Sequence, residues 1–178
     1  VREFCRDNYG VLWIGTEDGG LNRFNLNTKE FSFFAPSAGF TNIHGLCLVD
    51  DKLWVGTFSK GLKIIDTRTG TVLKTYQKNS SPRSLIDNSI FAICRTATGD
   101  IYLGTMFGLV KYNKQSDDFD RIPELNGKFV YDIKEDSGGN IWLATYANGA
   151  YCYNVNDRKW KNYVHDEKDT TSLSYNKV

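Results

Sequence analysis

Two stretches of the chain are nearly identical: LWIGTEDGGLNRFN at residues 12–25 and LWVGTFSKGLKIID at residues 53–66. The phrase returns as IYLGTMFGLVKYN at residues 101–113 and as IWLATYANGAYCYN at residues 141–154. One aromatic residue anchors each copy, at intervals of 41, 48 and 40 residues: Trp13, Trp54, Tyr102 and Trp142. Self-similarity at this period indicates a propeller or a solenoid.

Each repeat reads as four short strands separated by turn residues. In the first repeat the expected strands are Val1–Asp7, Val11–Thr16, Gly20–Leu26 and Glu30–Ala35. Short strands at this spacing, without helical periodicity, predict an all-β protein. Four strands in about 40 residues predict β-propeller blades. The predicted blades are residues 1–41, 42–89, 90–129 and 130–177.

The strand that carries each anchor has apolar residues on both of its faces. In the first repeat, Leu12 and Ile14 lie on one face and Trp13 lies on the other. A sheet with one wetted face would alternate apolar and polar residues, so both faces are expected to be buried. The residue two positions after each anchor is small: Gly15, Gly56, Gly104 and Ala144. Because alanine is accepted there, we expect a size limit rather than a positive φ. An aromatic side chain of the neighbouring blade is expected to fill the gap.

The repeat boundaries are visible in SLIDNSI (residues 84–90) and SLSYNKV (residues 172–178), which share the pattern S-L-x-x-N-x-[I/V]. By this rule Val1, Ile90 and Val178 each open a first strand. Four whole repeats are therefore expected. They could close by themselves, form half of an eight-bladed dimer, or belong to a larger ring, and the last alternative is favoured.

Composition narrows the range of partners. The chain has 22 basic and 21 acidic residues and a formal net charge of +1, so it lacks the basic footprint of a nucleic-acid binder. No apolar run approaches the length of a membrane span, so no membrane contact is expected from this segment.

Three cysteines occupy one equivalent strand position, where the fourth repeat has Lys134: Cys5, Cys47 and Cys94. Buried free thiols are the simplest interpretation, ahead of a disulfide or a metal site. Residues 135–140 (EDSGGN) are interpreted as a tight turn rather than a calcium loop. No metal site and no cofactor are expected.

The pattern G-x-L-W-I-G-T-x-x-G-G-L-N-R-F-N, with SLSYNKV before the next repeat, resembles the two-component regulator propeller repeat. The resemblance covers all four units, and it is weaker at Tyr102, Ala144 and Ala150. It implies a fragment of a seven-bladed propeller in the periplasmic sensor region of a hybrid histidine kinase/response regulator. It further implies detection of oligosaccharides, a homodimeric full-length protein, and histidine kinase activity that lies outside this segment.

The turns between second and third strands vary most in chemistry, and loops on a rigid scaffold commonly carry function. Aromatic residues there are candidates for stacking on sugar rings, and polar residues are candidates for hydrogen bonds to hydroxyl groups. The candidate ligand-binding residues are Glu17, Asp18, Phe58, Lys60, Met106, Phe107, Tyr146 and Asn148. The simpler alternative is that they are ordinary turn residues.

Three functions remain in competition. The leading one is a non-catalytic, ligand-recognising sensor propeller. The second is a scaffold that mediates dimerisation or contacts other blades and relays a signal sensed elsewhere. The third is a propeller lyase, which would need a metal-binding acid and a histidine base on one face. No motif places His44 or His165 beside a carboxylate.

Overall fold

The computed structural model describes residues 1–34 and 40–178, and over these residues the chain forms four four-stranded antiparallel sheets. The first sheet contains β1 (Glu3–Arg6), β2 (Val11–Gly15), β3 (Leu21–Asn25) and β4 (Phe31–Phe33). The second contains β5 (Ile43–Val49), β6 (Lys52–Thr57), β7 (Leu62–Asp66) and β8 (Val72–Tyr76). Ala35, placed by the sequence in the fourth strand, lies outside the described residues.

The third sheet contains β9 (Ile90–Arg95), β10 (Ile101–Thr105), β11 (Gly108–Asn113) and β12 (Asp118–Arg121). A short 3-10 helix, η2 (Pro123–Leu125), leads to the fourth sheet, which contains β13 (Val130–Glu135), β14 (Ile141–Thr145), β15 (Ala150–Asn154) and β16 (Lys159–Tyr163). In each sheet the strands follow one another in chain order. The predicted fold, an all-β array of four-stranded propeller blades, is confirmed.

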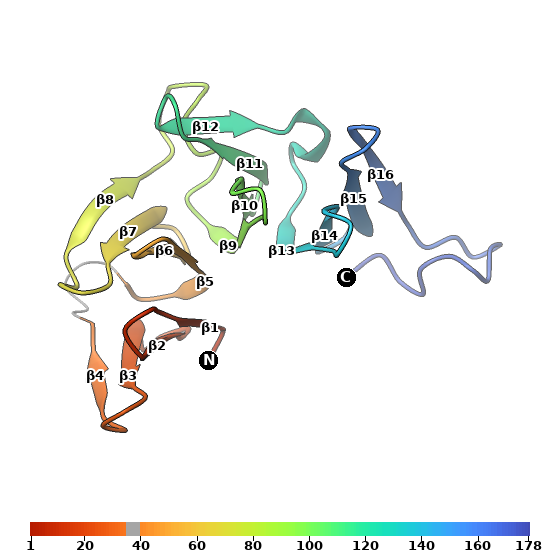
Figure 1. Cartoon of the computed structure of the whole chain (residues 1–178). Coiled ribbons are helices and arrows are strands. Elements are labelled where there is room, and N and C mark those ends of the chain that lie inside the picture. The colour runs from red at the N-terminus through yellow and green to blue at the C-terminus, as the bar shows by residue number, and fades with distance from the viewer. Residues whose placement is uncertain (35–39) are drawn as a thin grey trace.

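The four blades fan around a common centre (Figure 1). The first strand of each blade, β1, β5, β9 or β13, lies innermost, and the fourth strand lies at the rim (Figure 1). After β16 the chain runs outward and then returns to the inner side, where Val178 lies close to β14 (Figure 1). Every blade therefore contributes its first strand to one shared inner surface.

The apolar core consists of three clusters, each lying between two successive sheets. Trp13 belongs to the first, Trp54 to the second and Tyr102 to the third, with exposed fractions of 0%, 5% and 7%. Trp142 is the anchor of the fourth blade. No described sheet covers this face of the blade, and Trp142 is 37% exposed. The anchors therefore pack between blades, as the repeat predicts.

The small residue after each anchor faces the first strand of the next blade. A Cβ atom added at Gly15, Gly56 or Gly104 would lie 2.7, 2.7 or 2.8 Å from a methyl group of Ile43, Ile90 or Val130, respectively. The prediction of a size limit is confirmed, because none of these glycines has a positive φ. The prediction that an aromatic residue fills the gap is wrong: the gap holds a β-branched residue, whose compact methyl groups let the backbones approach.

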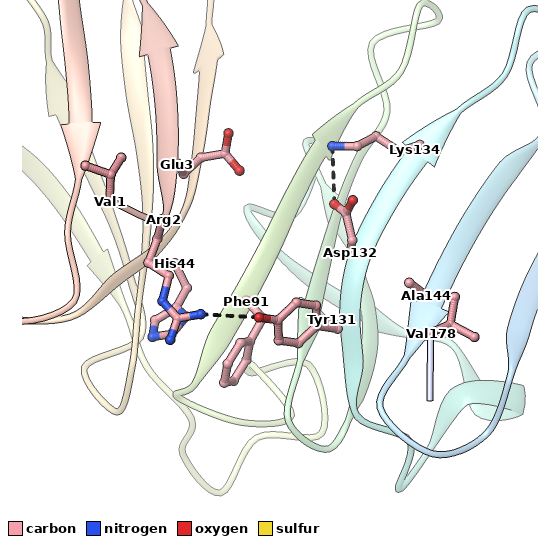
Figure 2. Close-up of a pocket in the computed structure, with 10 residues that line it drawn as sticks. All are labelled: Val1, Arg2, Glu3, His44, Phe91, Tyr131, Asp132, Lys134, Ala144 and Val178. Carbon is pink, nitrogen blue, oxygen red and sulfur yellow. Dashed lines mark hydrogen bonds and ion pairs between the residues drawn. The ribbon is translucent and has the colours of Figure 1, made fainter. Parts of the chain in front are cut away.

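The last blade repeats this arrangement, with Ala144 beside Val178 (Figure 2). The backbone N–H of Val178 donates to Thr145 O at 3.0 Å, as the N–H of Ile43 donates to Thr16 O at 3.0 Å. The register between first and second strands also repeats, since Cys5, Cys47 and Cys94 pair with the three buried anchors and Lys134 pairs with Trp142. These four positions are equivalent, as predicted.

Two of the anchors are held by a carboxylate six residues earlier in the chain. The indole N–H of Trp13 donates to Asp7 at 2.9 Å, and Asp7 also accepts the N–H groups of Tyr9 and Val11. Trp142 donates in the same way to Asp136 at 2.9 Å. Hydrogen bonds from Asn140 and then Trp142 lower the pKa of Asp136 to about 2. The loop of residues 135–140 is thus a turn organised around Asp136.

The glycine gap generates a first prediction. Gly56→Ala should lower the free energy of unfolding by about 1–3 kcal/mol, because the new methyl group meets Ile90 Cγ2 at 2.7 Å and its carbonyl oxygen at 3.2 Å. Urea denaturation measures the change. Gly138→Ala is the control, because the nearest atoms there are 3.3 Å away on the flexible side chains of Asn140 and Asp136. Equal costs at the two positions would contradict a limit on blade spacing.

The carboxylate–indole bond generates a second prediction. Asp7→Asn should lower the free energy of unfolding by about 2 kcal/mol, because an amide NH2 group would face N–H donors at a site that is 4% exposed. Asp136→Asn is the matched variant, and we expect it to cost less because solvent reaches Trp142. A smaller cost at Asp7 than at Asp136 would refute this ranking.

Candidate functional site

Three of the four first strands contain one extra residue relative to the second strand beside them. The register shifts between Ile43 and Gly45 in β5, across Gly104 and Thr105 in the β9–β10 pair, and between Val130 and Asp132 in β13. The extra residues are His44, Phe91 and Tyr131. Bulges of this kind leave a residue out of the ladder and redirect its side chain, and they are enriched next to functional sites.

Arg2 occupies the corresponding position in the first blade, one residue after Val1, and its backbone N–H donates to Gly15 O at 2.9 Å. Arg2, His44, Phe91 and Tyr131 therefore supply one side chain per blade, and we call them the mouth ring. All four line one cavity of about 530 Å³ at the inner surface of the propeller. Figure 2 shows the four side chains gathered at one end of this cavity.

The bulge residues join aromatic residues from the neighbouring loops. The ring centroids of His44 and Phe91 are 4.7 Å apart, and those of Phe91 and Phe129 are 4.4 Å apart. Phe129 also lies 5.8 Å from Tyr131 and stacks on Tyr146 at 5.5 Å. We call Phe58, Phe91, Phe129, Tyr131 and Tyr146 the aromatic row.

The aromatic row extends from the second to the fourth blade. Phe58 enters it through contacts with His44 at 6.0 Å and Phe91 at 6.1 Å. At the other end, the ammonium group of Lys177 lies 4.3 Å from the centroid of Tyr146, and its Nζ donates to the Tyr146 hydroxyl at 3.2 Å. A continuous apolar wall flanked by polar groups is the usual composition of a small-molecule site.

Arg2 supplies the charge at the mouth ring. Its guanidinium donates to Glu17 Oε1 at 2.6 Å and to the Tyr131 hydroxyl at 3.2 Å, so it links the first blade to the fourth. The hydrogen bond from Arg2 lowers the pKa of Glu17. Burial, and then the charge of Arg2, lower the pKa of His44, so its imidazole is neutral at pH 7. His44 therefore offers one donor and one acceptor rather than a positive charge.

The opposite end of the cavity carries carboxylates. Glu3 and Asp132 line it, and Asp132 is paired with Lys134 at 3.3 Å. Figure 2 shows these three side chains apart from the Arg2 group. The cavity thus has a cationic, aromatic end and an acidic end.

The structure brings together three of the eight residues that the sequence placed in a ligand site. Phe58 and Tyr146 belong to the aromatic row, and Glu17 is bound to Arg2. Among the described residues, the other five make no aromatic contact, ion pair or side-chain hydrogen bond with the mouth ring or the aromatic row. These five are Asp18, Lys60, Met106, Phe107 and Asn148. Their role in binding stays a prediction.

Sequence reasoning missed the mouth ring because it examined only the turns. The signal was present: His44, Phe91 and Tyr131 each follow a buried β-branched residue that opens a first strand. That position is polar or aromatic in every repeat, whereas the residue before it is Val or Ile.

The described residues contain no group of three His, Cys, Asp or Glu side chains arranged to hold a metal ion. His165 lies in the segment after β16, where its Nδ1 is 2.6 Å from Leu173 O. None of the described residues forms a helix with the length and apolar character needed to span a bilayer.

Comparison with known proteins identifies the repeats. A family model described as "Two component regulator propeller" matches residues 1–18, 84–107 and 124–147. Histidine kinase P4 of Formosa agariphila is 33% identical over 147 residues, which cover 76% of this chain and 11% of that protein. The chain therefore corresponds to a small part of that relative's length.

Two of the solved structures that share the fold illustrate the range of functions. The extracellular domain of the putative hybrid two-component system BT4673 from B. thetaiotaomicron is 21% identical, with a TM-score of 0.68 over 98% of this chain and 29% of that one. Virginiamycin B lyase from Staphylococcus aureus is 16% identical, with a TM-score of 0.67 over 92% of this chain and 55% of that one. The extracellular domain of a two-component system and a lyase thus resemble this chain about equally, so the fold alone does not separate their functions.

The electrostatics of the mouth ring generate a third prediction. Arg2→Gln should raise the pKa of His44, because it removes a cation and leaves Glu17 free to stabilise the imidazolium. An NMR titration of the imidazole signals measures the change. Arg95→Gln, which removes an arginine paired with Asp50, is the control and should leave the pKa of His44 unchanged. An unchanged pKa in Arg2→Gln would show that Arg2 does not act on this ring.

Proposed function

Since the chain carries two-component regulator propeller repeats, we propose that it is part of an extracytoplasmic sensor propeller that binds an oligosaccharide. In this proposal the propeller is periplasmic and belongs to a hybrid histidine kinase/response regulator. The similarity to a histidine kinase and to extracellular domains of two-component systems supports this role.

One observation supports this location for the binding site. Three β-bulges, in three separate blades, each direct a side chain to the same cavity. A bulge interrupts the ladder, and its repetition at one level of the inner surface supports a common ligand there. The aromatic row, in which Phe58, Tyr131 and Tyr146 are exposed, suits the apolar faces of sugar rings. The Tyr131 hydroxyl, Arg2 and neutral His44 offer hydrogen bonds to sugar hydroxyl groups.

We propose that the propeller itself is not catalytic. A lyase mechanism requires a general base next to an acid that holds a metal. In this structure the carboxylate whose charge acts on His44, Glu17, is engaged by the Arg2 guanidinium at 2.6 Å. The arrangement favours holding a polar ligand over abstracting a proton.

The scaffold alternative is supported by two exposed apolar faces. Trp142 is 37% exposed on the fourth blade, and Phe31 and Phe33 are 63% and 77% exposed on the first blade. The equivalent faces of the other blades are buried against a neighbouring sheet. We propose that further blades, or a second copy of the chain, cover them, and that the full-length protein is a homodimer. This role is compatible with ligand binding at the mouth.

A glycan array followed by calorimetric titration tests the proposed function. Phe91→Ala should weaken binding of any oligosaccharide captured by at least about tenfold, because Phe91 contacts four other members of the mouth ring and aromatic row. Leu73→Ala is the control: Leu73 is a 49% exposed apolar residue on the outer strand β8, away from the mouth ring, and its loss should leave affinity unchanged. Failure to bind any member of a broad panel would favour the scaffold.

A further inference from the structure

We propose that the mouth ring selects an acidic saccharide, with a uronate carboxylate bound by Arg2 and the sugar ring against Phe91 and Tyr131. This inference rests on the proposed function and names its ligand class. Its basis is the placement of one guanidinium beside an aromatic wall, inside a cavity large enough for a small molecule.

The exposure and orientation of Arg2 suit the binding of a carboxylate. Its side chain is 34% exposed, and the Tyr131 hydroxyl holds the guanidinium over the cavity at 3.2 Å. Arginine presents its donors as a planar fork that matches both oxygens of a carboxylate. Tyr131 can accept from Arg2 while its ring remains part of the aromatic row, so the hydrogen bond aligns the charge with the stacking surface.

The Glu17 carboxylate occupies the place at Arg2 that we propose for the ligand carboxylate. The two side chains are paired at 2.6 Å, but that of Glu17 is 55% exposed and lies on a turn. Exposed ion pairs contribute little net stability. A ligand carboxylate that also gains stacking contacts therefore displaces Glu17 at low cost, whereas a neutral sugar leaves the Arg2–Glu17 pair in place.

The charges around the cavity orient such a ligand. Glu3 and Asp132 lie at the end opposite Arg2, and Asp132 is already paired with Lys134. A second cation, Lys177, lies beyond Tyr146 at the far end of the aromatic row. Two members of the aromatic row therefore carry a cation, Arg2 at Tyr131 and Lys177 at Tyr146, so a ligand with carboxylates on successive sugars can engage both.

Matched ligands provide the decisive experiment. We would titrate the protein with α-1,4-linked oligogalacturonate and β-1,4-linked oligoglucuronate of two to four residues, and with the carboxyl-reduced form of each. The acidic form should bind at least about tenfold more tightly than its reduced form at low salt, and the difference should shrink as salt rises.

Three variants separate the contributions. Arg2→Gln should abolish the preference for the acidic form while binding of the reduced form persists. Glu17→Gln should strengthen binding of the acidic form by about threefold or more, because it removes the competing carboxylate. Arg95→Gln, which removes a similarly exposed arginine paired with Asp50, should change neither affinity and controls for net charge.

The outcomes distinguish this inference from the proposed function. Equal binding of acidic and reduced forms, or an acidic preference that survives in Arg2→Gln, overturns the inference and leaves the sensor role intact. Capture of neutral glycans only, with loss of binding in Phe91→Ala, does the same. The absence of binding by any saccharide overturns both.

Discussion

Neighbouring blades are spaced by one close contact, repeated at every junction. A glycine on the second strand of one blade receives a β-branched residue from the first strand of the next, as Gly56 receives Ile90. A larger side chain would not fit between them, so the two backbones approach closely there, and Trp54, two residues earlier on the same strand, packs into the apolar cluster between the blades.

The same contact positions the candidate site. Ile43, Ile90 and Val130 are wedged against the preceding blade, and the residue immediately after each one is the extra residue of a bulge. The wedge holds the backbone in place, and the bulge turns the next side chain toward the common cavity. The backbones of His44, Phe91 and Tyr131 are therefore anchored by contacts of the core, although their side chains are partly exposed.

The architecture could be predicted because it depends on repetition. The four anchors and the aligned cysteines define blades and register without any knowledge of contacts. The occupant of the glycine gap could not be predicted, since a missing side chain does not specify which of several apolar neighbours enters it. The mouth ring was missed because a bulge adds one residue to a strand without changing its composition. Asp7 and Asp136 were missed because two of the four copies lack a carboxylate at this place: Leu48 lies six residues before Trp54, and Thr96 lies six before Tyr102.

The bulge has a consequence for how such proteins diversify. His44, Phe91 and Tyr131 lie outside the pairing of the first two strands in their blades, and their side chains line the shared cavity. Arg, His, Phe and Tyr already occupy the four equivalent positions within one chain. Substitutions at these positions can therefore accumulate one blade at a time, and related proteins with the same scaffold can change ligand specificity without loss of the fold.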